Sequence, residues 1–289
     1  MSEHKYLALL QHIASLRESG ALLEVDDPYP VTLVNRWGYD RPPHQGLVQL
    51  FEQRKAEYAP VVEAIARYTD VFMRIPAHAP QSPIEPYWHN GWLPPLDGMS
   101  IYALIAENRP ARFIEVGSGN STKFAAKAIR DNNLATSILS IDPCPRAEID
   151  ALCQKVLRQP LECMDTAFFA SVTPNDLVFV DCSHRALQNS DVTAFFMDIL
   201  PMFPSGCIFG IHDICLPADY PPGWEKRYYN EQYMLATMLL YGAQGFNILL
   251  PSYYLSSNPH LCTPLHTLDA HLQRLGTSCS GSICWLQKR

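Results

Sequence analysis

Acidic side chains follow each of the main predicted strands of this chain. Short apolar runs rich in Ile, Val, Phe and Leu are typical of buried parallel strands. The acids at their ends are Glu115, Asp142, Asp165, Asp181 and Asp213. A single Asp is common in turns. Open α/β sheets bind ligands at the carboxyl ends of their strands. Acids at the ends of five successive strands therefore indicate a polar ligand that lies across that edge of the sheet.

A glycine turn follows the first of these strands. Residues 113–122 read FIEVGSGNST, which predicts a strand, a turn through Gly117 and Gly119, and a capped helix. The two glycines permit positive φ and close approach of the backbone to a ligand. Asp142, at the end of the second strand, is placed to reach ribose hydroxyls. A dinucleotide motif needs a third glycine where Thr122 stands, which argues against NAD.

Strands and helices alternate from this turn to the end of the chain. Further strands are predicted over residues 137–141, 161–164, 177–180, 207–211, 246–250 and 282–286. Helical spacing of apolar residues predicts helices over residues 147–157, 189–200 and 228–241. Repeated strand–helix units are typical of a doubly wound, mainly parallel sheet. The fold class we predict is therefore α/β.

The first third of the chain has a different character. Helices are predicted over residues 5–19, 47–68 and 99–107, with a break or kink at Pro60. Residues 76–95 hold several prolines together with Tyr87, Trp88 and Trp92. Solvated linkers lack aromatic residues, so an aromatic loop folded over a site is favoured. We expect residues 1–96 to cap a domain formed by residues 97–289, because their helices are too few to bury a core alone.

Composition limits the class of partner and the compartment. The chain has 289 residues, a net charge of −7 and 47% hydrophobic residues, which allows a large core and argues against binding to nucleic acid. Its 9 cysteines form no CxxC pair. Free thiols in a reducing cytoplasm are the simplest interpretation. No signal peptide and no apolar run of membrane-spanning length is recognised, so no membrane partner is expected.

From about residue 97 onward the chain resembles the class I S-adenosylmethionine-dependent methyltransferases. The pattern Glu115-x-Gly117-x-Gly119 is similar to the first motif of that family, and Asp142 to its ribose-binding acid. The resemblance implies a Rossmann-like, seven-stranded sheet whose last strand, residues 282–286, inserts antiparallel. The sequence VDCSH over residues 180–184, with IHD over residues 211–213, more narrowly resembles small-molecule and sugar O-methyltransferases.

The resemblance also implies which residues hold S-adenosylmethionine. Asp165 would read the adenine amino group, and Asp181 would lie beside the transferred methyl group. The full set of expected cofactor-binding residues is Glu115, Gly117, Ser118, Gly119, Asn120, Ser121, Asp142, Asp165 and Asp181.

Two routes to the chemistry are open from the sequence. A sulfonium methyl group is already activated, so the enzyme mainly has to position the acceptor, and a hydroxyl acceptor benefits from a base or a metal. His184 could be the base. Alternatively, Asp181 and Asp213 could bind Mg²⁺, a hard, oxygen-seeking ion, with His212 also in the catalytic group.

The acceptor is expected to be a small molecule or a saccharide. Trp92, His212 and Tyr228 are the candidate substrate contacts. The sequence leaves open whether oxygen or nitrogen accepts the methyl group, and whether the chain forms a homo-oligomer. Two other functions also remain open: a cofactor-binding partner or assembly module without transfer activity, and a metal-dependent hydroxylase-like enzyme on the same fold.

Overall fold

The computed structural model describes residues 3–18 and 32–289. The chain divides into two compact units, residues 1–34 and residues 35–289. In the first unit, helix α1 (Glu3–Glu18) confirms the helix predicted over residues 5–19, except for residue 19, which lies outside the described part. No helix in the described part of the chain is long and apolar enough to cross a membrane.

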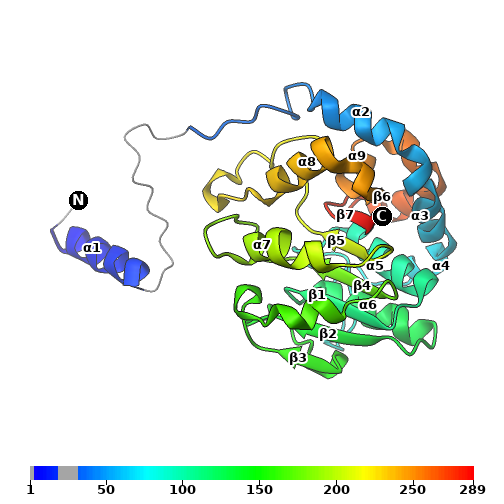
Figure 1. The fold of residues 1–289 in the computed structure, drawn as a ribbon, viewed down its shortest axis with the longest axis horizontal. Helices are drawn as coiled ribbons and strands as arrows, with labels where there is room; N and C mark the ends of the chain where they lie inside the picture. Colours follow the sequence, from blue (N-terminus) through cyan, green and yellow to red (C-terminus); the bar gives the residue numbers. More distant parts are fainter. Residues whose placement is uncertain (1–2, 19–31) are drawn as a thin grey trace. The chain divides into compact units, whose positions relative to one another are not determined.

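A seven-stranded sheet forms the centre of the second unit (Figure 1). Its strands are β1 (Arg112–Val116), β2 (Ser137–Ile141), β3 (Lys155–Leu157), β4 (Asp176–Val180), β5 (Ile208–Ile211), β6 (Phe246–Pro251) and β7 (Cys284–Lys288). Their order is β3-β2-β1-β4-β5-β7-β6, and only β7 runs antiparallel to both of its neighbours. This confirms the predicted Rossmann-like fold, including the antiparallel last strand.

The strand register brings the predicted site residues to one edge. Val116, the last residue of β1, pairs with Ile141 of β2 and Val180 of β4, and Val180 pairs with Ile211 of β5. These four strands therefore end level with one another. Whatever follows them in sequence emerges at the same crest.

The helices lie on both faces of the sheet. They are α2 (Gln45–Gln53), α3 (Lys55–Arg67), α4 (Thr69–Phe72), α5 (Pro95–Asn108), α6 (Asn120–Asp131), α7 (Asp191–Ala194), α8 (Glu231–Gly242), α9 (Ser252–Ser256) and α10 (His266–Arg274). The predicted helix over residues 47–68 is in fact two, α2 and α3. The break lies at Arg54, and Pro60 sits inside α3.

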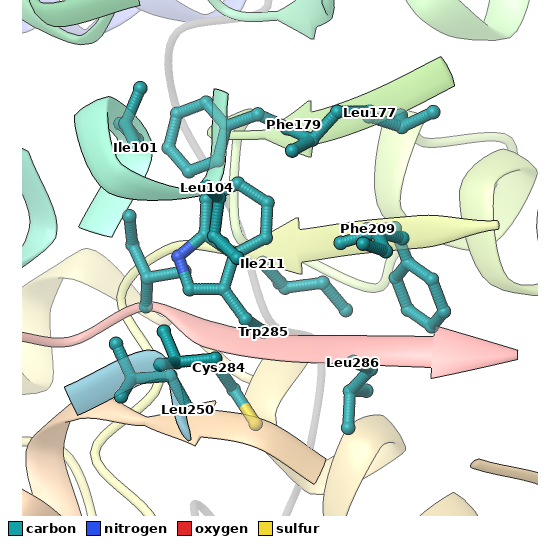
Figure 2. Packing of buried hydrophobic residues seen from close by; sticks show 14 of the residues in the cluster. Ile101, Leu104, Leu177, Phe179, Phe209, Ile211, Leu250, Cys284, Trp285 and Leu286 are labelled. Carbon is teal, nitrogen blue, oxygen red and sulfur yellow. The ribbon is translucent and has the colours of Figure 1, made fainter. Parts of the chain in front are cut away.

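Trp285 anchors β7 in the core. Its ring packs against Phe179 of β4, 5.8 Å between centroids, and lies among Ile101, Leu104 and Ile211 (Figure 2). The indole nitrogen donates to the Ser100 hydroxyl at 2.8 Å, so the buried polar atom of this side chain is satisfied. The antiparallel strand is thus fixed to α5, whose first turn carries a residue of the site.

Two sequence-based predictions in the middle of the chain were wrong. Residues 147–157 do not form a helix, because β3 lies within them and pairs with β2. The strand predicted over residues 161–164 is also absent, because Leu161–Cys163 form a 3₁₀ turn. β3 is a short strand at the edge of the sheet whose side chains are only partly buried, so it lacks a continuous apolar run. The predicted helix over residues 189–200 is α7 followed by one turn of π-helix.

Candidate active site

A pocket of about 470 Å³ opens at the carboxyl ends of β1, β2 and β4. Residues 117–121 of the glycine turn form one wall, and Asp142 and Asp181 reach the pocket from the ends of β2 and β4. Its volume lies within the range of ~300–1,000 Å³ common for small-molecule sites. Seven of the nine expected cofactor-binding residues therefore line this pocket, and Glu115 lies buried directly behind it. Asp165 is the only one of the nine that lies elsewhere.

The glycine turn is packed tightly against the end of β4. Gly117 has φ +76°, and a Cβ atom at this position would lie 1.8 Å from the Asp181 backbone oxygen. Only glycine therefore fits here, for reasons of both conformation and space. Gly119 differs, because its φ of 175° is open to any residue and an added Cβ would meet no atom within 4 Å. That open space belongs to the pocket, as a cradle for a ligand requires.

Glu115 supports the turn from below. Its side chain is fully buried in β1, and Oε2 accepts a hydrogen bond from the Thr122 hydroxyl, which itself accepts from the Gly119 backbone N–H at 3.1 Å. Thr122 thus closes a ring around the turn, a role that sequence reasoning missed when it saw only an absent third glycine. Burial raises the pKa of Glu115 to about 8. Glu115 Oε1 has no hydrogen-bond partner among the described residues.

We expect the variant Glu115→Gln to become progressively more stable than the wild type as pH rises. A group whose folded pKa is raised stabilises the fold fully below its unfolded pKa, and that contribution is lost as pH rises through about 8. The amide of the variant does not ionise, so the variant keeps this stability, and the difference from the wild type is of the order of a few kcal/mol above pH 8. Thermal unfolding between pH 5 and 9 measures it, with the exposed Glu63→Gln as control. A constant difference across pH would contradict the raised pKa.

Asp142 joins the turn to the end of β2. One carboxylate oxygen accepts from the Ser118 backbone N–H and the other from the Cys144 N–H, each at 2.7 Å. Each oxygen keeps a further lone pair for a ligand hydroxyl. The side chain is only 9% exposed, and what it exposes lines the pocket.

Asp165 lies elsewhere. It is exposed, outside the pocket, and its carboxylate accepts from the Ala167 backbone N–H as a helix cap. This follows from the displaced third strand. Leu161 and Glu162, from the 3₁₀ turn after β3, line the pocket instead.

The ends of β4 and β5 hold a cluster of two histidines and two aspartates. Asp181 Oδ1 lies 3.2 Å from both His184 Nε2 and His212 Nδ1. Asp213 has one oxygen 3.5 Å from His184 Nε2 and the other 3.6 Å from His212 Nδ1. Sequence reasoning named all four residues, and the structure brings them together.

Two buried acids that the sequence did not suggest lie behind the histidines. Glu231, at the start of α8, is 2.8 Å from His184 Nδ1, and Asp97, in the first turn of α5, is 3.4 Å from His212 Nε2. Asp97 also accepts hydrogen bonds from the backbone of Ser282, at the approach to β7. Acids are common in the first turn of a helix, so neither stood out in the sequence.

Every ring nitrogen of the two histidines therefore faces a carboxylate. Burial alone would lower the pKa of His184, but hydrogen bonds to Asp181 and Glu231 outweigh it and raise that pKa to about 10. The pKa of His212 is also raised, against burial, by the charges of Asp181 and Asp213. In turn the two histidines hold the pKa of Asp181 below its usual range, although burial opposes this.

This cluster also has the composition of a cation site. Donor atoms of Asp181, His184 and His212 all lie within 4.8 Å of one another, and Asp213 adds a second carboxylate. Glu231 and Asp97 hold the far ring nitrogens, as outer carboxylates do in metal sites. A mixed set of imidazole and carboxylate suits Zn²⁺, Mn²⁺ or Fe²⁺ better than Mg²⁺.

The candidate substrate contacts are only partly brought together. His212 lies in the cluster, whereas Tyr228 is 47% exposed and its neighbour Tyr229 packs on His184 with 4.6 Å between ring centroids. Residue 228 has φ +54°, which turns the chain so that the second tyrosine faces inward. Trp92 lines the pocket from the predicted aromatic loop.

Comparison with known proteins supports the sequence resemblance. Residues 114–214 match the family model described as Methyltransferase domain. No curated protein sequence matches the chain significantly.

Similar solved structures include an SAH-bound methyltransferase, PaMTH1 of Podospora anserina, at 12% identity and TM-score 0.41, covering 90% of this chain and 99% of that one. A putative O-methyltransferase from Klebsiella pneumoniae has 11% identity and TM-score 0.38, covering 79% and 89%. MycE of the mycinamycin pathway, in complex with Mg, SAH and mycinamycin VI, has 15% identity and TM-score 0.35, covering 64% and 47%. No acceptor follows from such distant likenesses.

The family match covers the glycine turn, Asp142 and the end of β5, and the sheet has the seven strands and the antiparallel last strand that the family resemblance implied. Residues 114–214 therefore form a methyltransferase domain.

Proposed function

We propose that this protein transfers a methyl group from S-adenosylmethionine to a hydroxyl group of a small molecule or saccharide. The observation that carries the proposal is the contact between Glu231 and the Nδ1 atom of His184. The other ring nitrogen of His184, Nε2, lies 3.2 Å from Asp181, a residue of the cofactor pocket. A carboxylate behind an imidazole fixes the ring and strengthens its other nitrogen as a base. A hydroxyl acceptor benefits from such a base, because its oxygen has to lose a proton during methyl transfer.

The residues of the pocket fit the cofactor. Glycine at position 117 permits the turn, position 119 leaves open space beside it, and Glu115 offers an unpartnered oxygen below. Asp142 would bind the ribose hydroxyls, and residues 117–121 would hold the methionine end. When bound, the cofactor supplies a methyl group on a positively charged sulfur. Asp165 takes no part in this proposal, because it lies outside the pocket.

His184 is the proposed proton acceptor. Its chain neighbours Ser183 and Arg185 line the pocket. Tyr229 packs on its ring from the loop before α8, here called the tyrosine-rich loop, which also holds Tyr220 and Tyr228. The acceptor hydroxyl would approach between Asp181 and these aromatic side chains. His212, held by Asp97, keeps Asp181 oriented from the opposite side.

A divalent cation at the same cluster is the second candidate arrangement. Asp181 and Asp213 are the proposed ligands, and the compact donor set around His184 and His212 favours it. The two arrangements exclude each other at His184. Its Nδ1 is already held by Glu231, so an Nε2 that binds a cation cannot also take a proton.

The setting of the reaction is also a proposal. The described part of the chain holds 9 free cysteines, which suits a reducing cytoplasm. We keep residues 1–96 as the proposed cap and residues 97–289 as the catalytic domain. Within the cap, Leu47, Phe51 and Ile65 of α2 and α3 are buried in the core of the second unit.

Equilibrium binding of S-adenosylmethionine tests the cofactor site with a matched pair of variants. We expect the wild type to bind, Asp142→Ala to bind about 10-fold or more weakly because two ribose hydrogen bonds are lost, and the exposed Asp165→Ala to bind like the wild type. Absence of binding at millimolar concentration, or normal binding by Asp142→Ala, would contradict the proposal. Labelled methyl transfer to a panel of hydroxyl compounds then identifies the acceptor atom.

A further inference from the structure

A tryptophan and an arginine stack on each other at one end of the pocket. The Arg146 guanidinium carbon lies 4.4 Å from the centre of the Trp92 ring. Both side chains line the pocket, although Trp92 comes from the loop before α5 and Arg146 follows β2. The sequence suggested Trp92 as an acceptor contact. Its surroundings indicate another role.

The two ends of the pocket differ in what surrounds them. Near Arg146 the lining consists of residues that follow β2 and β3: Asp142, Pro143, Cys144, Ala147, Pro160 and Leu161. The histidine cluster lies beyond β4 and β5, on the other side of β1 in the strand order. A cofactor whose ribose is held by Asp142 and whose methyl group reaches Asp181 must place its purine at the Arg146 end. Trp92 thus lies with the purine, away from the acceptor.

The loop that carries Trp92 is held rigidly. The Asn90 side-chain amide donates to the backbone oxygens of Tyr87 and Leu93, and its oxygen accepts from the N–H groups of Trp92 and Leu93. Trp88, two residues before Asn90, is buried against Phe124 of α6. The backbone on both sides of Trp92 is therefore fixed, while its own ring stays 57% exposed.

The stacked pair has unused capacity for a ligand. Among residues 3–18 and 32–289, no carboxylate lies within ion-pairing distance of Arg146. A large, exposed aromatic ring on a rigid loop costs hydrophobic free energy in the empty site and gains it when a flat ring covers it. Purines stack well on indole and on guanidinium groups.

We propose that the stacked pair Trp92–Arg146, called the clamp below, holds the purine of the cofactor against the exposed part of the Trp92 ring, so that the loop before α5 selects the nucleoside and not the acceptor. This inference rests on the proposed use of S-adenosylmethionine. It makes the aromatic loop part of the cofactor site and leaves recognition of the acceptor to the tyrosine-rich loop beside His184.

Calorimetry with two ligands tests the clamp: S-adenosylhomocysteine, and 5′-methylthioadenosine, which keeps only the nucleoside half. We expect Trp92→Leu to weaken both by the same factor, about 10-fold or more, since stacking on one base is lost. Trp92→Phe, which keeps a ring, should restore most of the affinity. The control is Trp224→Leu, which breaks a similar stack with Arg227 (3.9 Å) outside the pocket and should bind both ligands normally.

Fluorescence supplies a second readout. Trp92 is one of 5 tryptophans in the chain, and a purine stacked on it should change the emission. We expect this change in the wild type and in Trp224→Leu, and its loss in Trp92→Phe. Normal affinity of Trp92→Leu for both ligands would overturn the clamp while leaving the proposed function intact. Failure of the wild type to bind S-adenosylhomocysteine would instead overturn the proposed function.

Discussion

Replacing His184 by alanine is expected to lower kcat for methyl transfer by about 10²- to 10⁴-fold, the usual contribution of a general base. The affinity for S-adenosylmethionine should not change, because His184 does not line the cofactor pocket. Steady-state kinetics with labelled cofactor, together with calorimetry, separate the two effects. A His184→Ala variant with wild-type kcat at every pH would show that another group takes the proton.

The pH dependence of kcat tests the same role of His184. Because the pKa of His184 is raised to about 10 in the free protein, the base form becomes more populated as pH rises, and activity should still be increasing well above pH 7. Glu231 is one cause of the raised pKa. The variant Glu231→Gln should therefore move the rising limb of the profile toward neutral pH. An unchanged pH profile in Glu231→Gln would show that Glu231 has no part in the proton transfer.

Metal analysis distinguishes the base from the cation ligand. If His184 is the base, the purified protein should hold no stoichiometric divalent ion, and a chelator should leave kcat unchanged. If a cation occupies Asp181 and Asp213, the chelator should abolish activity and the added ion should restore it. The variant Asp213→Asn then serves as the matched test, since it removes one charge and keeps the side-chain shape.

The sequence predicted the parts of the site that follow long buried strands. β1, β2, β4 and β5 are mainly apolar and almost wholly buried segments, so their ends, and the acids near those ends, could be placed from the sequence. β3 could not, because a three-residue edge strand needs no such run, and Asp165 was misplaced with it. Glu231 and Asp97 were missed for a different reason: they reach the histidines only through tertiary packing of α8 and α5 onto the crest of the sheet.

The same contrast explains Thr122 and Tyr229. A missing third glycine told against one cofactor, but only the structure shows that the threonine hydroxyl links the Gly119 backbone to Glu115. Of the two adjacent tyrosines, Tyr229 is the one that faces His184, and this depends on the positive φ at Tyr228. Such details are set by backbone conformation in loops, where apolar periodicity carries no signal.

The two glycines of the turn should differ in how alanine affects the stability of the protein. At Gly117 the new Cβ would meet the Asp181 backbone oxygen at 1.8 Å and would hold an L-residue at φ +76°. Overpacking and strain together cost a few kcal/mol, so we expect Gly117→Ala to lower Tm by at least about 5 °C. Because the displaced backbone is that of Asp181, cofactor binding and methyl transfer should both be lost.

Gly119→Ala is the matched control, since the same methyl group would there meet no atom within 4 Å and the φ of 175° is unrestricted. We expect a Tm like that of the wild type, measured by thermal unfolding, and a weaker affinity for S-adenosylmethionine, because the methyl group occupies pocket space. The pair thus separates two uses of glycine in one turn: Gly117 lets β1 lie against β4, and Gly119 leaves room for the ligand. An equal loss of Tm in both variants would contradict that division, and so would unchanged cofactor affinity in Gly119→Ala.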